Sequence, residues 1–373
     1  MSGSLPLEKR QAQLIVALQT HGLDAIAFNP SSSLYYLTGL HFHLSERPVI
    51  VIFSTQHDPI IVLPKLEAAK LQGLDYLLEG FTYGEDPSQW EQVFTQALQS
   101  AGLANAKIGL EPRSFRVLEL RLLEQSAPKA KFIPAEETVA ALRMYKDESE
   151  IGAMQKAAHI AQQALQATLP RIKTGVSERA IAAELSLQLL RHGSNPQLPF
   201  FPIVSGGPNS ANPHAAPSDR KLAAGDLLVI DWGANVDGYF SDITRTFAIG
   251  EVEPEYRQIA EIVLAANRAG HAAAGPGVSA ESVDQAARQV ITAAGYGPYF
   301  THRTGHGLGL EGHEEPYIRS DNPLLLQPGM TFTIEPGIYL PNRNGVRIED
   351  DVVITPTGCL SLTDLPRELI TLP

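Results

Sequence analysis

The sequence predicts an α+β fold built from two related halves, preceded by a smaller α/β domain. One series of motifs occurs twice in the second part of the chain, with offsets near one hundred residues: a helix start, His-x-x-Pro, Leu-x-x-Gly, and an apolar strand that ends in an acid. Each copy closes with a turn and a return strand that carries a second carboxylate. Such a repeat indicates two copies of one structural unit. We expect one domain over residues 1–138 and a second over 139–373.

The first domain alternates strands and helices, which favours a sheet with mixed strand directions. Its first helix is expected to end near Gly22, and the turn residues Asn29 to Ser32 are expected to follow a short strand. The expected strands are 24–28, 48–53, 59–63 and 107–110, and the expected further helices are 90–101 and 115–125.

The second domain is expected to begin with a long helix after Asp147. Asp147-x-x-Glu150 has the pattern of a capping box, in which each side chain accepts a hydrogen bond from the other residue's backbone amide. Two later helices open at the matching sequences Gly-Val-Ser and stop at Gly193 and Gly295. These matched helices form the first part of the repeat.

The first acidic pair of the repeat is Asp231 and Asp242. The two residues are symmetric about Val236 and Asp237, so a hairpin folded there sets the carboxylates directly opposite each other, with Cβ atoms about 5 Å apart. Opposed like charges destabilise a sheet, and burying them costs more. A bound cation is the simplest way to offset that cost.

The second acidic pair is Glu335 and Glu349, which are symmetric about Asn342. The strands 331–335 and 346–350 are expected to flank that turn. If the halves are related by a pseudo-twofold axis, the two pairs meet at one centre. Four acids at one centre suit a dinuclear metal site.

Histidine supplies a further candidate ligand in the second half. His306 lies between Gly305 and Gly307, which let the backbone approach a site closely, and imidazole is a frequent ligand of Mn, Co, Fe and Zn. His302 is expected at the surface or behind the ligands. His214 and His313 occupy matched His-x-x-Pro sequences in the two halves, which favours a shared role at the site.

The chain resembles the M24 metallopeptidases, which include methionine aminopeptidase, aminopeptidase P and prolidase, over nearly its whole length. The resemblance rests on motifs of the second domain, namely the hairpin 231–246, Gly305–Gly307, His313–Pro316, Glu335–Gly337 and Val346–Asp350. It implies a pita-bread fold with a pseudo-twofold repeat. The first domain is similar to the creatinase/prolidase type, with weaker matches at Tyr36–Gly39 and Glu46-Arg47. That domain implies a peptidase that cleaves Xaa-Pro bonds.

The resemblance also implies which residues hold the metal. Asp242 and Glu349 bridge two divalent ions. Asp231 completes the ligands of one ion, and His306 and Glu335 complete those of the other. A hydroxide that bridges the ions then acts as the nucleophile. The ligand chemistry admits Mn, Co, Fe or Zn, and the family favours Mn or Co.

The remaining roles also follow from the resemblance. Glu335 passes a proton from the nucleophile to the leaving nitrogen. His313 stabilises the developing oxyanion, and His214 holds the substrate near the scissile bond. Arg347 shares a strand face with Glu349 and is expected either to orient ligand carboxylates or to meet a product carboxylate.

Composition and charge argue against several other classes of protein. The net charge of −12 and the lack of a basic stripe argue against nucleic acid or an anionic membrane as a partner. The single cysteine excludes a disulfide framework, and no apolar run is long enough to span a membrane. We expect a cytoplasmic homodimer acting on proline-containing peptides.

Four possibilities for the function remain open from the sequence. The substrate is either an Xaa-Pro dipeptide or the N-terminus of a longer peptide. A creatinase-like hydrolase of small amides and a catalytically retired binding protein share the fold.

Overall fold

The computed structural model describes residues 7–373, and its contacts divide the chain into two units between Arg143 and Met144. The expected boundary at residue 138 falls inside helix α5 (Glu136–Arg143), which belongs to the first unit. In this helix, the hydroxyl of Thr138 lies 3.3 Å from Nδ1 of His21, just beyond α1.

The first unit is built on one six-stranded sheet with the order β4-β3-β2-β1-β5-β6. Strand β1 pairs antiparallel with β2 and parallel with β5, so the predicted mixture of strand directions is confirmed. The strands are β1 (Ala25–Phe28), β2 (Ile50–Ser54), β3 (Ile60–Pro64), β4 (Glu79–Tyr83), β5 (Lys107–Leu110) and β6 (Lys131–Pro134). The helices besides α5 are α1 (Leu7–Thr20), α2 (Ser32–Thr38), α3 (Trp90–Ser100) and α4 (Val117–Ser126).

Besides short 3-10 helices, the sequence analysis missed the α-helices α2 and α5 and the strands β4 and β6 of this unit. Strands β4 and β6 form the two edges of the sheet and are largely exposed, so they lack a strong apolar pattern. The expected turn at Asn29 to Ser32 is only partly correct. Ser31 caps a helix there by accepting a hydrogen bond from the amide of Leu34, 3.2 Å away.

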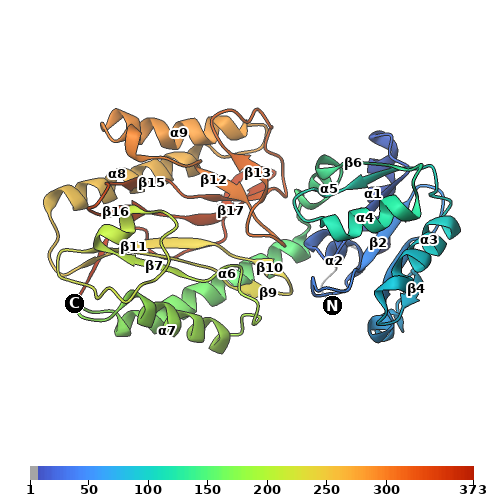
Figure 1. Cartoon of the computed structure of the whole chain (residues 1–373). Helices are drawn as coiled ribbons and strands as arrows, with labels where there is room; N and C mark the ends of the chain where they lie inside the picture. Colours follow the sequence, from blue (N-terminus) through green and yellow to red (C-terminus); the bar gives the residue numbers. More distant parts are fainter. Residues whose placement is uncertain (1–6) are drawn as a thin grey trace. The chain divides into compact units, whose positions relative to one another are not determined.

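The second unit places two helix pairs on opposite sides of two sheets, as Figure 1 shows. The two larger sheets have the orders β19-β11-β8-β7 and β13-β12-β14-β17-β18, and β10-β9 and β15-β16 form two-stranded sheets. The helices are α6 (Glu148–Thr168), α7 (Glu178–Arg191), α8 (Pro254–Ala273) and α9 (Ala280–Ala293). The strands are β7 (Ile203–Gly206), β8 (Leu227–Trp232), β9 (Asn235–Val236), β10 (Tyr239–Phe240), β11 (Ile243–Ile249), β12 (Gly305–Gly307), β13 (Glu314–Ile318), β14 (Thr331–Ile334), β15 (Gly337–Tyr339), β16 (Gly345–Arg347), β17 (Asp350–Thr355), β18 (Gly358–Ser361) and β19 (Ile370–Leu372).

The repeat is visible in matching backbone hydrogen bonds of the two halves. The amide of Gly175 donates to the carbonyl of Leu222 (2.8 Å), and the amide of Gly277 donates to the carbonyl of Leu326 (2.7 Å). In each half the leucine amide donates back to the residue that follows the glycine. Each Gly-Val-Ser helix start is therefore tied to its own Leu-x-x-Gly turn, as a duplicated unit requires.

The long helix α6 begins as predicted. Asp147 accepts hydrogen bonds from the amides of Ser149 and Glu150, and Glu150 accepts one from the amide of Asp147, which completes the capping box. Helix α6 packs on the sheet that contains β8. There the indole of the fully buried Trp232 donates to the carbonyl of Ala161 at 2.8 Å. None of the helices in residues 7–373 is both long and apolar enough to cross a membrane.

Candidate metal centre

The first hairpin turns one position later than the sequence suggested. Strand β11 pairs with β8 so that Thr244, and not Asp242, stands opposite Asp231. The turn is centred on Asp237 and Gly238, whose φ angles of 53° and 86° are both positive, as in a type I′ turn. The expected direct pairing of Asp231 with Asp242 is therefore wrong. The two acids are diagonal neighbours, and both line one cavity.

The second hairpin has the predicted register. Strands β15 and β16 pair Gly337 with Arg347, and the same register continued by two residues sets Glu335 opposite Glu349. An isolated bridge then joins Glu349 to Thr244 of the first half. Thr244 thus pairs with Asp231 on one side and with Glu349 on the other. This contact brings the two acidic pairs together.

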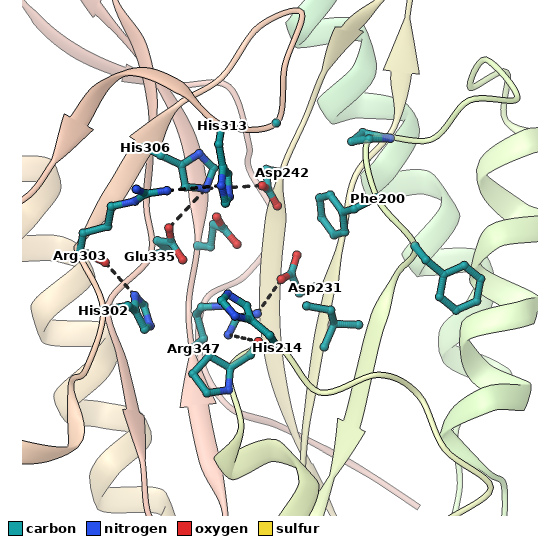
Figure 2. Close-up of a pocket in the computed structure, with 16 residues that line it drawn as sticks. Phe200, His214, Asp231, Asp242, His302, Arg303, His306, His313, Glu335 and Arg347 are labelled. Atoms are coloured by element: carbon teal, nitrogen blue, oxygen red, sulfur yellow. Dashed lines mark hydrogen bonds and ion pairs between the residues drawn. The ribbon is translucent and has the colours of Figure 1, made fainter. Parts of the chain in front are cut away.

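The five predicted ligands all line one cavity of about 690 Å³ (Figure 2). Oxygen or nitrogen atoms of Asp242, His306 and Glu349 lie within 4.8 Å of one another, close enough to hold one ion. The Nε2 atom of His306 is 3.4 Å from Oε1 of Glu335 and 3.8 Å from Oδ2 of Asp242. Asp231 contributes the remaining carboxylate on the same cavity wall.

Hydrogen bonding prepares His306 to act as a ligand. Its Nδ1 lies 3.1 Å from the carbonyl of Gly307, which can only accept, so Nδ1 carries the proton. The lone pair of Nε2 then faces the carboxylates. Burial, with a smaller effect of His313, holds the pKa of His306 well below its usual value, so the ring is neutral, as metal binding requires.

The acids of the cavity carry an electrostatic cost that cations would remove. Burial, followed by repulsion from neighbouring carboxylates, raises the pKa values of Asp242 and Glu349 well above the usual range. Burial also raises the pKa of Glu335 to about 7. The Oδ1 atoms of Asp231 and Asp242 are buried and receive no hydrogen bond from any donor within 7–373. A set of four carboxylates and one imidazole with unsatisfied buried oxygens fits divalent cations.

Two further residues hold the candidate ligands from behind and were not predicted. The fully buried Thr244 hydroxyl donates to Oε2 of Glu349 at 2.6 Å. The backbone amide of Asp242 donates to the carboxylate of Asp351, with the shorter contact at 3.0 Å. Each supporting residue lies two positions after a predicted ligand. Period-two spacing on a strand is the signal that could have found them.

Arg347 lies at the centre of a polar network beside Asp231. Its guanidinium donates to Asp231 Oδ2 (2.6 Å), to the Thr244 hydroxyl (3.0 Å) and to the hydroxyl of Tyr339 (2.9 Å). Tyr339 lies 2.9 Å from Nε2 of His302, and burial lowers the pKa of His302 to about 3. Of the two roles expected for Arg347, orienting a ligand carboxylate accounts for these contacts.

The two other predicted histidines reach the cavity from opposite halves. His214 and His313 both line it, and the rings of His313 and His306 are 3.9 Å apart between centroids. Figure 2 shows Arg303 pointing toward His313, with Phe200 on the opposite side of the cavity. Arg303 and Phe200 were not singled out from the sequence.

Comparison with known proteins identifies the class to which this fold and site belong. Residues 152–356 match the Metallopeptidase family M24, and residues 10–145 match the Creatinase/Prolidase N-terminal domain. The chain belongs to metallopeptidase family M24, and its second unit has the pita-bread fold. The family implies a dinuclear metal site.

Similar proteins of known name cover almost the whole chain. The chain is 35% identical over 359 residues to the Xaa-Pro dipeptidase of Lactobacillus delbrueckii subsp. lactis. The aligned region covers 95% of this chain and 97% of that protein. The crystal structure of a dipeptidase from Pyrococcus horikoshii OT3 has a TM-score of 0.92 at 38% identity and covers 97% of this chain and 100% of that one. The X-Pro aminopeptidase from Thermotoga maritima MSB8 has a TM-score of 0.84 at 32% identity, with coverages of 97% and 99%.

Proposed function

We propose that this chain is a dinuclear metallo-exopeptidase that hydrolyses the Xaa-Pro bond of dipeptides. The observation that carries the proposal is the convergence of buried acids and His306 from both halves in one cavity. The names of similar proteins support the substrate class. Action on the N-terminus of longer peptides is the second candidate, supported by the likeness to an X-Pro aminopeptidase.

The donor set supports a division of the ligands between two ions. Asp242 and Glu349 would contact both ions, because they are the two most buried of the four carboxylates and both are repelled by the neighbouring acids. Asp231 would hold one ion, and His306 with Glu335 would hold the other. Mn or Co is the proposed metal, and Zn or Fe suits the same donors.

When bound, the two ions lower the pKa of a water molecule and make it nucleophilic at neutral pH. Glu335 would take the water proton and pass it to the leaving nitrogen. His214, which also lines the cavity, would hold the substrate near the scissile bond.

His313 is prepared to donate a hydrogen bond. The guanidinium of Arg303 can only donate, and its Nη2 lies 3.4 Å from Nδ1 of His313, so Nδ1 accepts and Nε2 carries the proton. Burial and then Arg303 lower the pKa of His313, which keeps the ring neutral. A neutral donor beside the ligand His306 can stabilise the negative charge that develops on the scissile carbonyl oxygen.

The decisive experiment compares substrates on Mn²⁺-loaded protein. Ala-Pro, Ala-Pro-Ala and creatine are incubated separately, and the products are quantified by chromatography. Cleavage of Ala-Pro well above that of Ala-Pro-Ala supports a dipeptidase, and the reverse supports an aminopeptidase. Cleavage of creatine alone would replace the peptidase proposal. Absence of both bound metal and turnover would favour a retired binding protein.

We also propose that the chain acts as a cytoplasmic homodimer. The loop Gly39–Glu46 is the proposed contact with the partner's site, and its Leu44 side chain is 51% exposed. Light scattering at micromolar concentration tests the assembly, and a monomeric mass would contradict it. Fractionation of the source cells tests the location.

A further inference from the structure

The cavity contains two arginines, and only one of them pairs with a carboxylate within residues 7–373. Arg347 donates to Asp231, Thr244 and Tyr339, so little of its hydrogen-bonding capacity remains for a ligand. Arg303 forms no ion pair with any carboxylate in residues 7–373. Its contacts are the 3.4 Å approach to His313 and a stacking contact with Tyr317.

Arg303 is nevertheless held in a defined position. Its guanidinium carbon lies 4.4 Å from the centre of the Tyr317 ring, an arrangement that restricts a flexible side chain without neutralising it. The side chain is half-buried and lines the cavity. A positioned, unneutralised guanidinium in a cavity is suited to bind a carboxylate through two parallel hydrogen bonds.

The order of the side chains indicates which carboxylate fits. His306 belongs to the candidate metal cluster, the ring of His313 lies next to it at a tilt of 52°, and Arg303 contacts His313. In an Xaa-Pro dipeptide the terminal carboxylate belongs to the residue just after the scissile bond, and consecutive Cα atoms are about 3.8 Å apart. If the scissile carbonyl oxygen lies beside His313, the C-terminal carboxylate of the dipeptide is therefore within reach of Arg303.

We propose that Arg303 binds the C-terminal carboxylate of the dipeptide substrate and thereby selects dipeptides over longer peptides. This inference rests on the proposed Xaa-Pro hydrolysis. In a longer peptide the same position holds a neutral peptide group followed by more chain, so the charge-assisted hydrogen bonds are lost. The carboxylate of the proline product would occupy the same place.

The kinetic test uses Mn²⁺-loaded protein with Ala-Pro and its C-terminal amide, Ala-Pro-NH₂. Wild-type protein is expected to prefer the free acid by at least about tenfold in kcat/KM, the effect of one charge-assisted contact. Arg303→Gln should remove that preference by raising KM for Ala-Pro more than KM for the amide, while any loss of kcat through the contact with His313 falls equally on both substrates. Arg303→Lys should restore part of the preference. The matched control Arg319→Gln removes an exposed arginine that pairs with Asp321, and it should keep the wild-type preference.

Several outcomes overturn the proposal. These are a wild-type protein that cleaves acid and amide equally well, or an Arg303→Gln variant that keeps the preference because KM rises equally for both substrates. A loss confined to Glu-Pro-NH₂ would show that Arg303 binds an acidic N-terminal side chain instead.

A binding measurement separates failure of this proposal from failure of the proposed function. If wild-type protein cleaves neither substrate, the proposed function fails, and calorimetry with L-proline and L-prolinamide still tests Arg303. Tighter binding of proline than of prolinamide, abolished in Arg303→Gln and kept in Arg319→Gln, supports the carboxylate site. Equal binding of the two compounds, or a preference that survives in Arg303→Gln, contradicts it.

Discussion

The hydroxyl of Thr244 donates a 2.6 Å hydrogen bond to the carboxylate of Glu349, across the junction of the two halves. The same hydroxyl accepts a hydrogen bond from Arg347 at 3.0 Å. Both partners are buried, so the geometry of Glu349 depends on a side chain from the other half of the repeat.

Replacement of Thr244 should therefore weaken metal binding. Thr244→Val removes the donor, and loss of such a supporting contact typically costs about 10- to 100-fold in metal affinity. Thr244→Ser should keep most of the affinity. Thr246→Val is the control, because the Thr246 hydroxyl donates to the backbone carbonyl of Arg347 instead of a ligand. Calorimetric titration with Mn²⁺ measures all three variants, and wild-type affinity in Thr244→Val would contradict the role.

The bridging assignment predicts distinct metal contents for three ligand variants. Asp242→Asn should weaken both sites and abolish activity, because it puts a neutral amide between two dications. Asp231→Asn should chiefly empty one site, and His306→Ala should empty the other. Elemental analysis counts the ions, with circular dichroism as the control for folding. Two ions per chain, or normal turnover, in Asp242→Asn would show that the bridging assignment is wrong.

None of these three variants should unfold the metal-free protein. Burial and the neighbouring acids raise the pKa of Asp242, so its charge is unfavourable when no metal is present. Asp242→Asn should leave the melting temperature of the metal-free protein unchanged or higher. A drop of several degrees would indicate that the carboxylate has a structural role.

The raised pKa of Glu335 predicts a pH-dependent stability difference. In the metal-free protein this pKa is about 7, above its usual value of 4.5, because of burial. Stabilisation by the bound proton is therefore complete below pH 4.5 and is lost as the pH rises through about 7. The free energy of unfolding of Glu335→Gln minus that of wild type should therefore rise between pH 4.5 and about 7 and stay constant above that range. Urea unfolding of metal-free proteins tests this, with the exposed Glu368→Gln as control; a flat difference would contradict it.

Two arginines of the second hairpin should differ sharply in their effect on stability. Arg347 is buried against Asp231, and removing one partner of a buried ion pair typically costs about 3–5 kcal/mol. Arg347→Gln should lower the free energy of unfolding by that order. Arg343 is 42% exposed where it pairs with Glu253 and Glu255, so Arg343→Gln should change little. Similar losses in both variants would refute the buried role of Arg347.

The convergence of the four acids in one cavity could be predicted from sequence because they recur at near-symmetric positions around two turns. That reasoning gave the register of Glu335 and Glu349 correctly, since Asn342 with its φ of 61° lies at the centre of the turn. It failed by one position for Asp231 and Asp242. The Asp237-Gly238 pair favours a type I′ turn, and this local preference decided the register.

Period-two spacing could have pointed to Thr244 and Asp351, but the partner that each one contacts was beyond sequence reasoning. The contacts of Thr244 with Glu349 and of Asp242 with Asp351 each join the two halves over more than one hundred residues. No local pattern encodes such a pairing, because it depends on how the two sheets meet. Arg303 was missed because its lack of a carboxylate partner within residues 7–373 can be seen only when the positions of its neighbours are known.

Because the site is divided between the two halves of the repeat, it also depends on the order in which the chain is synthesised. Asp231 and Asp242 are made first, while Glu335 and Glu349 follow about one hundred residues later. Until the second half has emerged and folded against the first, the early acids have no Glu349 to meet at Thr244. A nascent chain that lacks the second half therefore carries only two of the five candidate metal ligands, Asp231 and Asp242, and cannot complete the site.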